Sequence, residues 1–208
     1  MAAGRAEPIS AHWGRERGTP IDRWYIARFL EQHAGDIRGR VLEVMDDRYT
    51  SRFGTEVERS DVLDVDPANP SATVVRDLSD PDRFPREEYD CLVVTQTLQF
   101  VYDLGAAIAS IHGALRSGGV CLATVPVLSR LDRPENNVGE FWRLTPAACE
   151  RLFGDRFGAG RVEATGYGNP LSSTAFLIGL AAEELGDRML EASHPLFPLV
   201  VSVRAVKA

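Results

Sequence analysis

Polar side chains suited to binding and catalysis follow an apolar run near the middle of the chain. Residues 89–94 have the composition of a buried strand, and a helical pattern links them to a second apolar run at 120–126. A strand, a crossover helix and a second strand form a parallel unit. Open sheets of such units bind their ligands at the carboxyl ends of the strands. We therefore expect the site to include Thr95, Gln96, Gln99 and Asp103.

Composition excludes several classes of protein. With 208 residues, of which 44% are hydrophobic, the chain can bury one core and has no linker that would separate two. The net charge of -7, with arginines scattered among acids, argues against a nucleic-acid partner. The sequence has neither a run long enough to span a membrane nor an apolar signal region, so we expect a cytoplasmic protein without a membrane partner. Cys91, Cys121 and Cys149 are widely spaced, which favours buried free thiols over metal ligands or disulfides.

Strand and helix patterns alternate along the chain. Short apolar runs predict strands at 40–44, 61–66, 72–77, 161–166 and 198–207. Helices are predicted from Pro20 to before Gly35, from Thr145 through Leu152 and at 172–185, with Thr19 and Thr145 as caps.

Taken together, these segments resemble the class I S-adenosylmethionine-dependent methyltransferases over residues 39–207. The matching pieces are an acidic first strand, 41–44, a fourth strand, 89–94, and a Leu-Arg-x-Gly-Gly turn, 115–119, that leads into a strand ending in Pro126. The last piece is the most specific. The resemblance implies a Rossmann-like α/β fold with a mostly parallel seven-stranded sheet, an antiparallel terminal strand and helices on both faces. It also implies a lid segment and helix at 1–38 and a single domain at 39–208.

The resemblance implies positions for the cofactor, S-adenosylmethionine. A carboxylate at the end of the second strand accepts hydrogen bonds from the ribose hydroxyls, and we favour Asp66 over the nearby Asp64. Asp77 would accept from the adenine amine and the Leu78 backbone N–H would donate to the ring, although Asp77 also suits a turn cap. The remaining predicted cofactor residues are Glu43, Met45, Thr95 and Gln96.

One turn departs from the family. The first strand should lead into glycines, whose missing Cβ atoms let the methionyl part of the cofactor approach the backbone. Here residues 45–50 contain no glycine, and Met45 stands at the first glycine position, where its side chain would fill cofactor space. Asp46 and Asp47 are either helix caps or charges that attract the ammonium and sulfonium and repel the carboxylate.

Methyl transfer mainly requires alignment of donor and acceptor, with a base when the acceptor is a hydroxyl. The candidates for catalysis are His12 and Tyr25 from the amino-terminal segment and Gln99 and Asp103 after the fourth strand, with Asp22, Arg23 and Tyr102 beside them. The long segment after the fifth strand supplies Asn137, Trp142 and Arg143 as candidate acceptor-binding residues, which suit a sugar or a carboxylate.

The sequence therefore predicts a methyltransferase that acts on a small molecule, with a sugar or secondary-metabolite oxygen as acceptor and a homodimer as a candidate assembly. No metal site is predicted. The alternative is the same fold without methyl transfer, either a cofactor-free cyclase or isomerase or a non-catalytic binding partner, because of the altered turn. A dinucleotide-binding dehydrogenase would need G-x-G-x-x-G after the first strand, and that pattern is absent.

Overall fold

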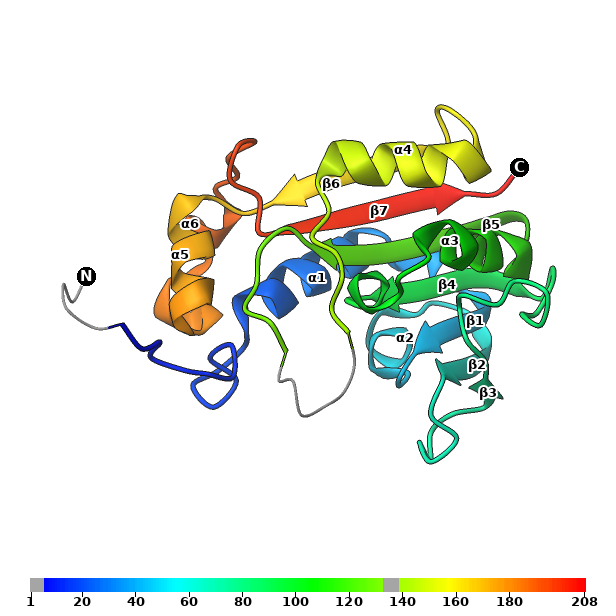
Figure 1. Ribbon diagram of the computed structural model, residues 1–208, viewed down its shortest axis with the longest axis horizontal. Coiled ribbons are helices and arrows are strands. Elements are labelled where there is room, and N and C mark those ends of the chain that lie inside the picture. Colours follow the sequence, from blue (N-terminus) through cyan, green and yellow to red (C-terminus); the bar gives the residue numbers. More distant parts are fainter. Residues whose placement is uncertain (1–5, 133–138) are drawn as a thin grey trace.

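The computed structural model describes residues 6–132 and 139–208, which form one seven-stranded sheet with helices on both faces (Figure 1). The order across the sheet is β3-β2-β1-β4-β5-β7-β6. The first five strands run parallel, and β7 is antiparallel to both of its neighbours, β5 and β6. The strands are β1 (Gly39–Val44), β2 (Val57–Asp64), β3 (Val74–Val75), β4 (Tyr89–Thr95), β5 (Leu115–Pro126), β6 (Val162–Tyr167) and β7 (Val200–Val206). The predicted fold class is confirmed.

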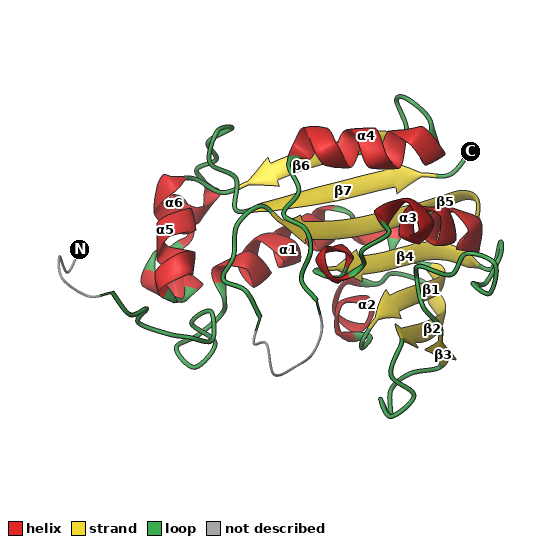
Figure 2. Cartoon of the chain, viewed as in Figure 1, coloured by secondary structure: helices red, strands yellow, loops and turns green. Residues whose placement is uncertain are grey.

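Helices connect some of the strands but not all of them (Figure 2). The helices are α1 (Ile21–Gln32), α2 (Arg48–Phe53), α3 (Leu104–Ala114), α4 (Pro146–Phe157), α5 (Pro170–Ile178) and α6 (Asp187–Glu191). Turns and loops, residues 65–73 and 76–88, form the connections from β2 to β3 and from β3 to β4. The carboxyl ends of β2 and β3 therefore lie beside short loops.

The strand residues alternate between two apolar layers, as the two-residue period of a strand requires. Leu92 and Val94 of β4 face α3 and α4, whereas Cys91 and Val93 face the layer that contains α1. Burial on both faces is the reason that β4 is almost continuously apolar in sequence. A third apolar cluster joins the start of α1 to α5 and α6.

Several predicted boundaries were wrong. Pro20, not Thr19, is the N-cap residue of α1, because the Thr19 backbone bonds to the segment around Ala182 and Glu183. The third strand shortens to two residues. The helix predicted at 172–185 ends at Ile178, where Gly179 adopts a left-handed φ of 83° and terminates α5.

The predicted cap of α4 and the predicted burial of the three thiols are confirmed. The Thr145 hydroxyl accepts a hydrogen bond from the Ala148 N–H and caps α4. Cys91, Cys121 and Cys149 are buried free thiols, and burial raises the pKa of each thiol. Among the described residues, no helix has the length and apolar character to cross a membrane, and no group of three or more His, Cys, Asp or Glu residues could hold a metal.

Candidate functional site

A hollow of about 550 Å³ lies at the carboxyl ends of β2 and β3. Val65 and Val75 contribute apolar walls, and these side chains are 66% and 37% exposed. Arg76, Asp77 and Arg83 are among its polar lining residues. Exposed apolar side chains beside polar groups suit a flat heterocycle with hydrogen-bonding edges.

Asp64 is the last residue of β2 and is held in a defined position. Its Oδ2 accepts a hydrogen bond from the Asn69 amide at 2.7 Å, and its Oδ1 accepts one from the Asp66 backbone N–H at 3.0 Å. Asn69 also donates to the Met45 carbonyl at 2.8 Å, which ties the loops after β1 and β2 together. Asp66 lies two residues beyond the strand, is exposed and accepts from the Ala68 N–H. The geometry therefore favours Asp64 over Asp66 as the ribose ligand.

Asp77 lines the hollow and also organises the turn that follows it. Its Oδ1 accepts a hydrogen bond from the Ser79 N–H at 2.8 Å, and its carbonyl accepts from the Asp80 N–H. Leu78 is 4% exposed and packs in the core. Because a carboxylate oxygen can accept a second bond, the turn-capping role leaves Asp77 available to a ligand.

The turn after β1 keeps the backbone form of a glycine turn without any glycine. Met45 has a φ of 77°, which non-glycine residues rarely adopt, and its N–H donates to the Leu63 carbonyl. Its side chain is 63% exposed, so it is not locked into the space expected for the cofactor. Asp46 forms a close ion pair with Arg48, and the Asp47 side chain makes no capping bond to α2.

Glu43 is the cap of α2. This buried carboxylate at the end of β1 accepts hydrogen bonds from the N–H groups of Tyr49 and Thr50 at 3.1 and 2.7 Å. Burial raises the pKa of Glu43 to about 7, against the opposing effect of the two N–H bonds. Of the two alternatives for these aspartates, capping applies to Asp46, whose Oδ1 accepts a hydrogen bond from the N–H of Arg48, the first residue of α2, at 3.1 Å. The Asp47 carboxylate instead accepts a hydrogen bond from the Ser51 hydroxyl.

Buried polar atoms without partners gather at the carboxyl ends of β4 and β5. They are Gln96 Nε2, Gln99 Oε1 and Thr124 Oγ1. The three residues are adjacent, because the Gln96 N–H donates to the Thr124 carbonyl at 2.9 Å and the Gln99 amide donates to the Gln96 carbonyl at 3.0 Å. Thr95 pairs with Thr124 across the two strands. An unpaired buried polar atom is costly, so a cluster of them indicates a place for a polar ligand or water.

The amino-terminal segment contacts the segment that follows β5. The Trp13 indole donates to the Ser129 hydroxyl at 3.1 Å, and the Arg130 guanidinium lies 3.6 Å from the Trp13 ring centroid. His12 lies beside this contact, in a turn whose backbone is held by the Ser10 hydroxyl. The Tyr25 hydroxyl instead donates to the Leu190 carbonyl at 2.8 Å and is buried, so it anchors α1 to α6.

Aromatic side chains stand near the same end of the sheet. Tyr102 is 70% exposed and lies beside Phe141 and Trp142, with ring centroids 5.2 and 6.0 Å away. The Trp142 indole donates to the Val101 carbonyl, and Arg143 pairs with Glu140 at 2.8 Å. Two other predicted residues do not join this group: the Asp103 carboxylate caps α3 through the Ala106 N–H, and Asn137 lies outside the described residues.

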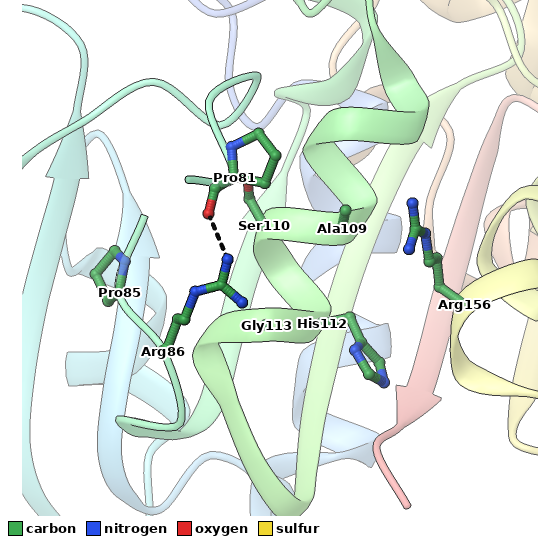
Figure 3. Close-up of a pocket in the computed structure, with 8 residues that line it drawn as sticks. All are labelled: Pro81, Pro85, Arg86, Ala109, Ser110, His112, Gly113 and Arg156. Atoms are coloured by element: carbon green, nitrogen blue, oxygen red, sulfur yellow. Dashed lines mark hydrogen bonds between the residues drawn. The ribbon is translucent and has the colours of Figure 1, made fainter. Parts of the chain in front are cut away.

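A separate hollow of about 310 Å³ lies beside the carboxyl-terminal half of α3, at the other end of this helix from Asp103 (Figure 3). Arg86, Ser110, His112 and Arg156 line it, and it includes none of the predicted site residues. His112 and Arg156 lie in the last turns of α3 and α4, where positive charge stabilises helix ends. The candidate site at the carboxyl ends of the strands does not include this hollow.

Sequence reasoning missed two residues of that site. Asn69 lies in a polar loop, and nothing in its spacing marks it as the bridge between two turns. Thr124 had a usable signal, since it is the polar residue in the otherwise apolar run 120–126.

Part of the sequence and the overall fold are similar to those of known proteins. Residues 33–123 match the family model of a methyltransferase domain. The fold is similar to that of a SAM-dependent methyltransferase from Archaeoglobus fulgidus, with a TM-score of 0.60 and 11% identity, over 89% of this chain and 94% of that one. It is also similar to the fold of an S-adenosylmethionine dependent methyltransferase from Mesorhizobium loti, with a TM-score of 0.55 and 15% identity, over 90% of this chain and 100% of that one. The N-methyltransferase NodS from Bradyrhizobium japonicum is similar with a TM-score of 0.53 and 14% identity, over 90% of this chain and 97% of that one. No curated protein matched.

The mostly parallel sheet, with a hollow at the carboxyl ends of β2 and β3, has a Rossmann-like α/β fold. The fold is shared with solved SAM-dependent methyltransferases, and residues 33–123 match a methyltransferase domain, so S-adenosylmethionine is the cofactor to test against this site. The residues present fit its adenosine half, through Asp64, Asp77 and the two exposed valines of the hollow. At the methionyl end the backbone form is kept at Met45, while the glycines are not.

Proposed function

We propose that this protein methylates a hydroxyl oxygen of a polyhydroxylated small molecule, such as a sugar or a secondary metabolite. S-adenosylmethionine supplies an activated methyl group, so the protein has mainly to bind, align and shield the acceptor. The observation that carries the proposal is the cluster of unpaired buried polar atoms on Gln96, Gln99 and Thr124. Hydroxyl groups both donate and accept, so one class of ligand can satisfy the amide nitrogen, the amide oxygen and the threonine hydroxyl.

The exposed aromatic side chains support the same acceptor class. Tyr102 and Phe141 offer open ring surfaces next to the segment that follows β4. The Gln99 carbonyl accepts from the Phe141 N–H at 2.7 Å, so these rings are tied directly to the polar cluster. An apolar ring surface beside polar groups suits the two faces of a sugar, one of which is rich in C–H groups.

We propose that residues 1–38 cover this acceptor site. The described part of that segment contacts the chain beyond β5 through Trp13, Ser129 and Arg130, and the buried Arg130 Nε is unpaired as well. Of the candidates for a base, Tyr25 and Asp103 are engaged in hydrogen bonds that hold α1 and α3. His12 is the candidate base that we retain, because it neighbours the Trp13 contact.

A second candidate function is a methyltransferase-fold protein that binds or rearranges a small molecule without methyl transfer. The absence of glycine in the turn after β1 favours it. Calorimetric titration with S-adenosylmethionine and S-adenosylhomocysteine separates the two, since only a methyltransferase needs to bind both. A protein that binds neither ligand at millimolar concentration would move the assignment to this second function.

The acceptor class is tested by methyl transfer from labelled S-adenosylmethionine to panels of polyols, carboxylates and amines. We expect transfer to polyols. Thr124→Val removes the unpaired hydroxyl with little change in volume, and it should raise KM for the acceptor about tenfold. Ser110→Ala is the matched control, because Ser110 also carries a buried unpaired hydroxyl but lies in α3 at the other hollow. Equal effects of the two substitutions would refute the role of Thr124.

A further inference from the structure

The hollow beside the carboxyl-terminal half of α3 collects nitrogen-bearing side chains from three elements. Arg86 comes from the connection between β3 and β4, His112 from α3 and Arg156 from α4, and all three line the hollow. None of the described residues that line it is acidic. Figure 3 shows Arg86 and Arg156 on either side of the α3 face that carries Ala109 and Gly113. Two guanidinium groups and an imidazole therefore share one hollow, in a chain whose net charge is -7.

The two arginines keep donors that no neighbouring acid uses. Among the described residues, the Arg86 guanidinium makes one hydrogen bond, from Nη2 to the Pro81 carbonyl at 3.4 Å. Arg156 makes no ion pair or hydrogen bond with any residue in 6–132 or 139–208. A guanidinium has five N–H donors in a planar fork. Both side chains are therefore free to donate to an anion in the hollow.

The Ser110 hydroxyl is an independent sign of a ligand at the same place. Ser110 is 2% exposed and lines the hollow, and its Oγ has no hydrogen-bond partner. A serine inside a helix can donate to the carbonyl four residues before it, and this hydroxyl does not. In Figure 3, Ser110 lies on the side of α3 that faces Pro81 and Arg86. A buried hydroxyl without a partner is costly, so a polar group in the hollow would stabilise it.

Gly113 leaves space in front of α3. It lies in the last turn of the helix without a positive φ, and a Cβ at this position would meet no atom within 4 Å. Neither the backbone conformation nor a close packing contact requires glycine here. Alanine is the better helix former. The missing side chain therefore keeps open a part of the hollow that a larger residue would fill.

Charge and size together indicate the class of ligand. The carboxyl end of a helix carries roughly half a negative charge, so the ends of α3 and α4 offset about one of the two guanidinium charges and leave an attraction for anions. A volume of about 310 Å³ is at the small end of the range for ligand sites, and Pro81, Pro85 and Ala109 add apolar surface. A phosphoryl group has three acceptor oxygens and up to two charges, enough for both arginines and the serine hydroxyl. A carboxylate has only two oxygens.

We propose that this hollow binds the phosphoryl group of a small organic phosphate, with Arg86 and Arg156 as charged donors and the Ser110 hydroxyl as a neutral donor. The hollow is separate from the candidate site at the carboxyl ends of the strands, so this second site is independent of methyl transfer. Stabilisation of helix ends by positive charge accounts for His112 and Arg156. It does not account for Arg86, for the unpaired hydroxyl or for Gly113.

The test uses glycerol 3-phosphate, titrated calorimetrically into the full chain at low ionic strength, with inorganic phosphate and succinate as comparison ligands. The variants are Arg86→Gln, Arg156→Gln and Gly113→Leu. Arg151→Gln is the matched control for charge, because Arg151 lies on the same helix as Arg156 and pairs with Asp155 at the surface. Gly113→Ala is the matched control for the filled hollow.

We expect glycerol 3-phosphate to bind the wild type more tightly than succinate does. Arg86→Gln and Arg156→Gln should each weaken it about 10- to 100-fold, whereas Arg151→Gln should stay within about twofold of the wild type. Gly113→Leu should abolish binding and Gly113→Ala should retain it. Thr124→Val should leave binding unchanged, since it alters the other site.

Circular dichroism and thermal unfolding establish that each variant is folded, and the two arginine variants decide the result if Gly113→Leu does not fold. A wild type that shows no binding at millimolar glycerol 3-phosphate overturns the proposal. Equal weakening by Arg86→Gln and Arg151→Gln also overturns it, because attraction by the overall charge would then suffice. Tighter binding of succinate than of glycerol 3-phosphate overturns the assignment to a phosphoryl group.

Discussion

Replacement of Met45 by glycine tests the turn after β1 most directly. A side chain at the φ of 77° observed for Met45 costs roughly 1 to 2 kcal/mol relative to a right-handed conformation. Glycine removes this cost but adds about 0.5 to 1 kcal/mol of unfolded-chain entropy. Because the side chain is 63% exposed, its loss sacrifices little burial. Because of the positive φ of Met45, we expect glycine at this position to stabilise the fold.

The matched control is Met45→Ala, which also removes the long side chain but keeps the Cβ. We expect the glycine variant to be about 0.5 to 1 kcal/mol more stable than the alanine variant in urea unfolding. For a chain of this size, that difference corresponds to roughly 1 to 4 °C in Tm. An alanine variant as stable as the glycine variant would refute the left-handed turn. The glycine variant should also bind S-adenosylhomocysteine more tightly than the wild type, with no change for 5′-methylthioadenosine.

Two further predictions concern buried and strand-end carboxylates. Since burial raises the folded-state pKa of Glu43 to about 7, above its value of 4.5 when unfolded, the folded state binds the extra proton in that window. The free energy of unfolding should therefore fall, by up to a few kcal/mol, as pH rises from about 4.5 to 7. Urea unfolding across this pH range should show the loss. The Glu43→Gln variant should show a smaller dependence of stability on pH. At the hollow, Asp64→Ala should weaken binding of 5′-methylthioadenosine by about 1 to 3 kcal/mol in calorimetry, whereas Asp66→Ala should change it little. The reverse order would restore Asp66 as the ribose ligand.

The hydrophobic periodicity of the sequence and its cap and turn residues account for most of the fold. A buried parallel strand needs apolar residues on both faces, and β4 shows them; a proline after a capping threonine marks the start of α4. The boundaries that failed depend on distant contacts. Thr19 has the right type for a cap, but its backbone is used by the segment around Ala182. The sequence around Thr19 does not show that its backbone bonds to this distant segment.

The sequence by itself determined the order of the elements and the edge of the sheet at which the site lies, because side-chain period and turn chemistry are local properties. It also revealed the missing glycines, but it could not show that Met45 keeps the glycine-like backbone. Only the tertiary structure decided that Asp64 rather than Asp66 ends β2, and that Glu43 accepts hydrogen bonds from the second and third N–H groups of α2. Each of these depends on which side chain from another element reaches a given carboxylate or N–H group, and that is fixed by packing in three dimensions.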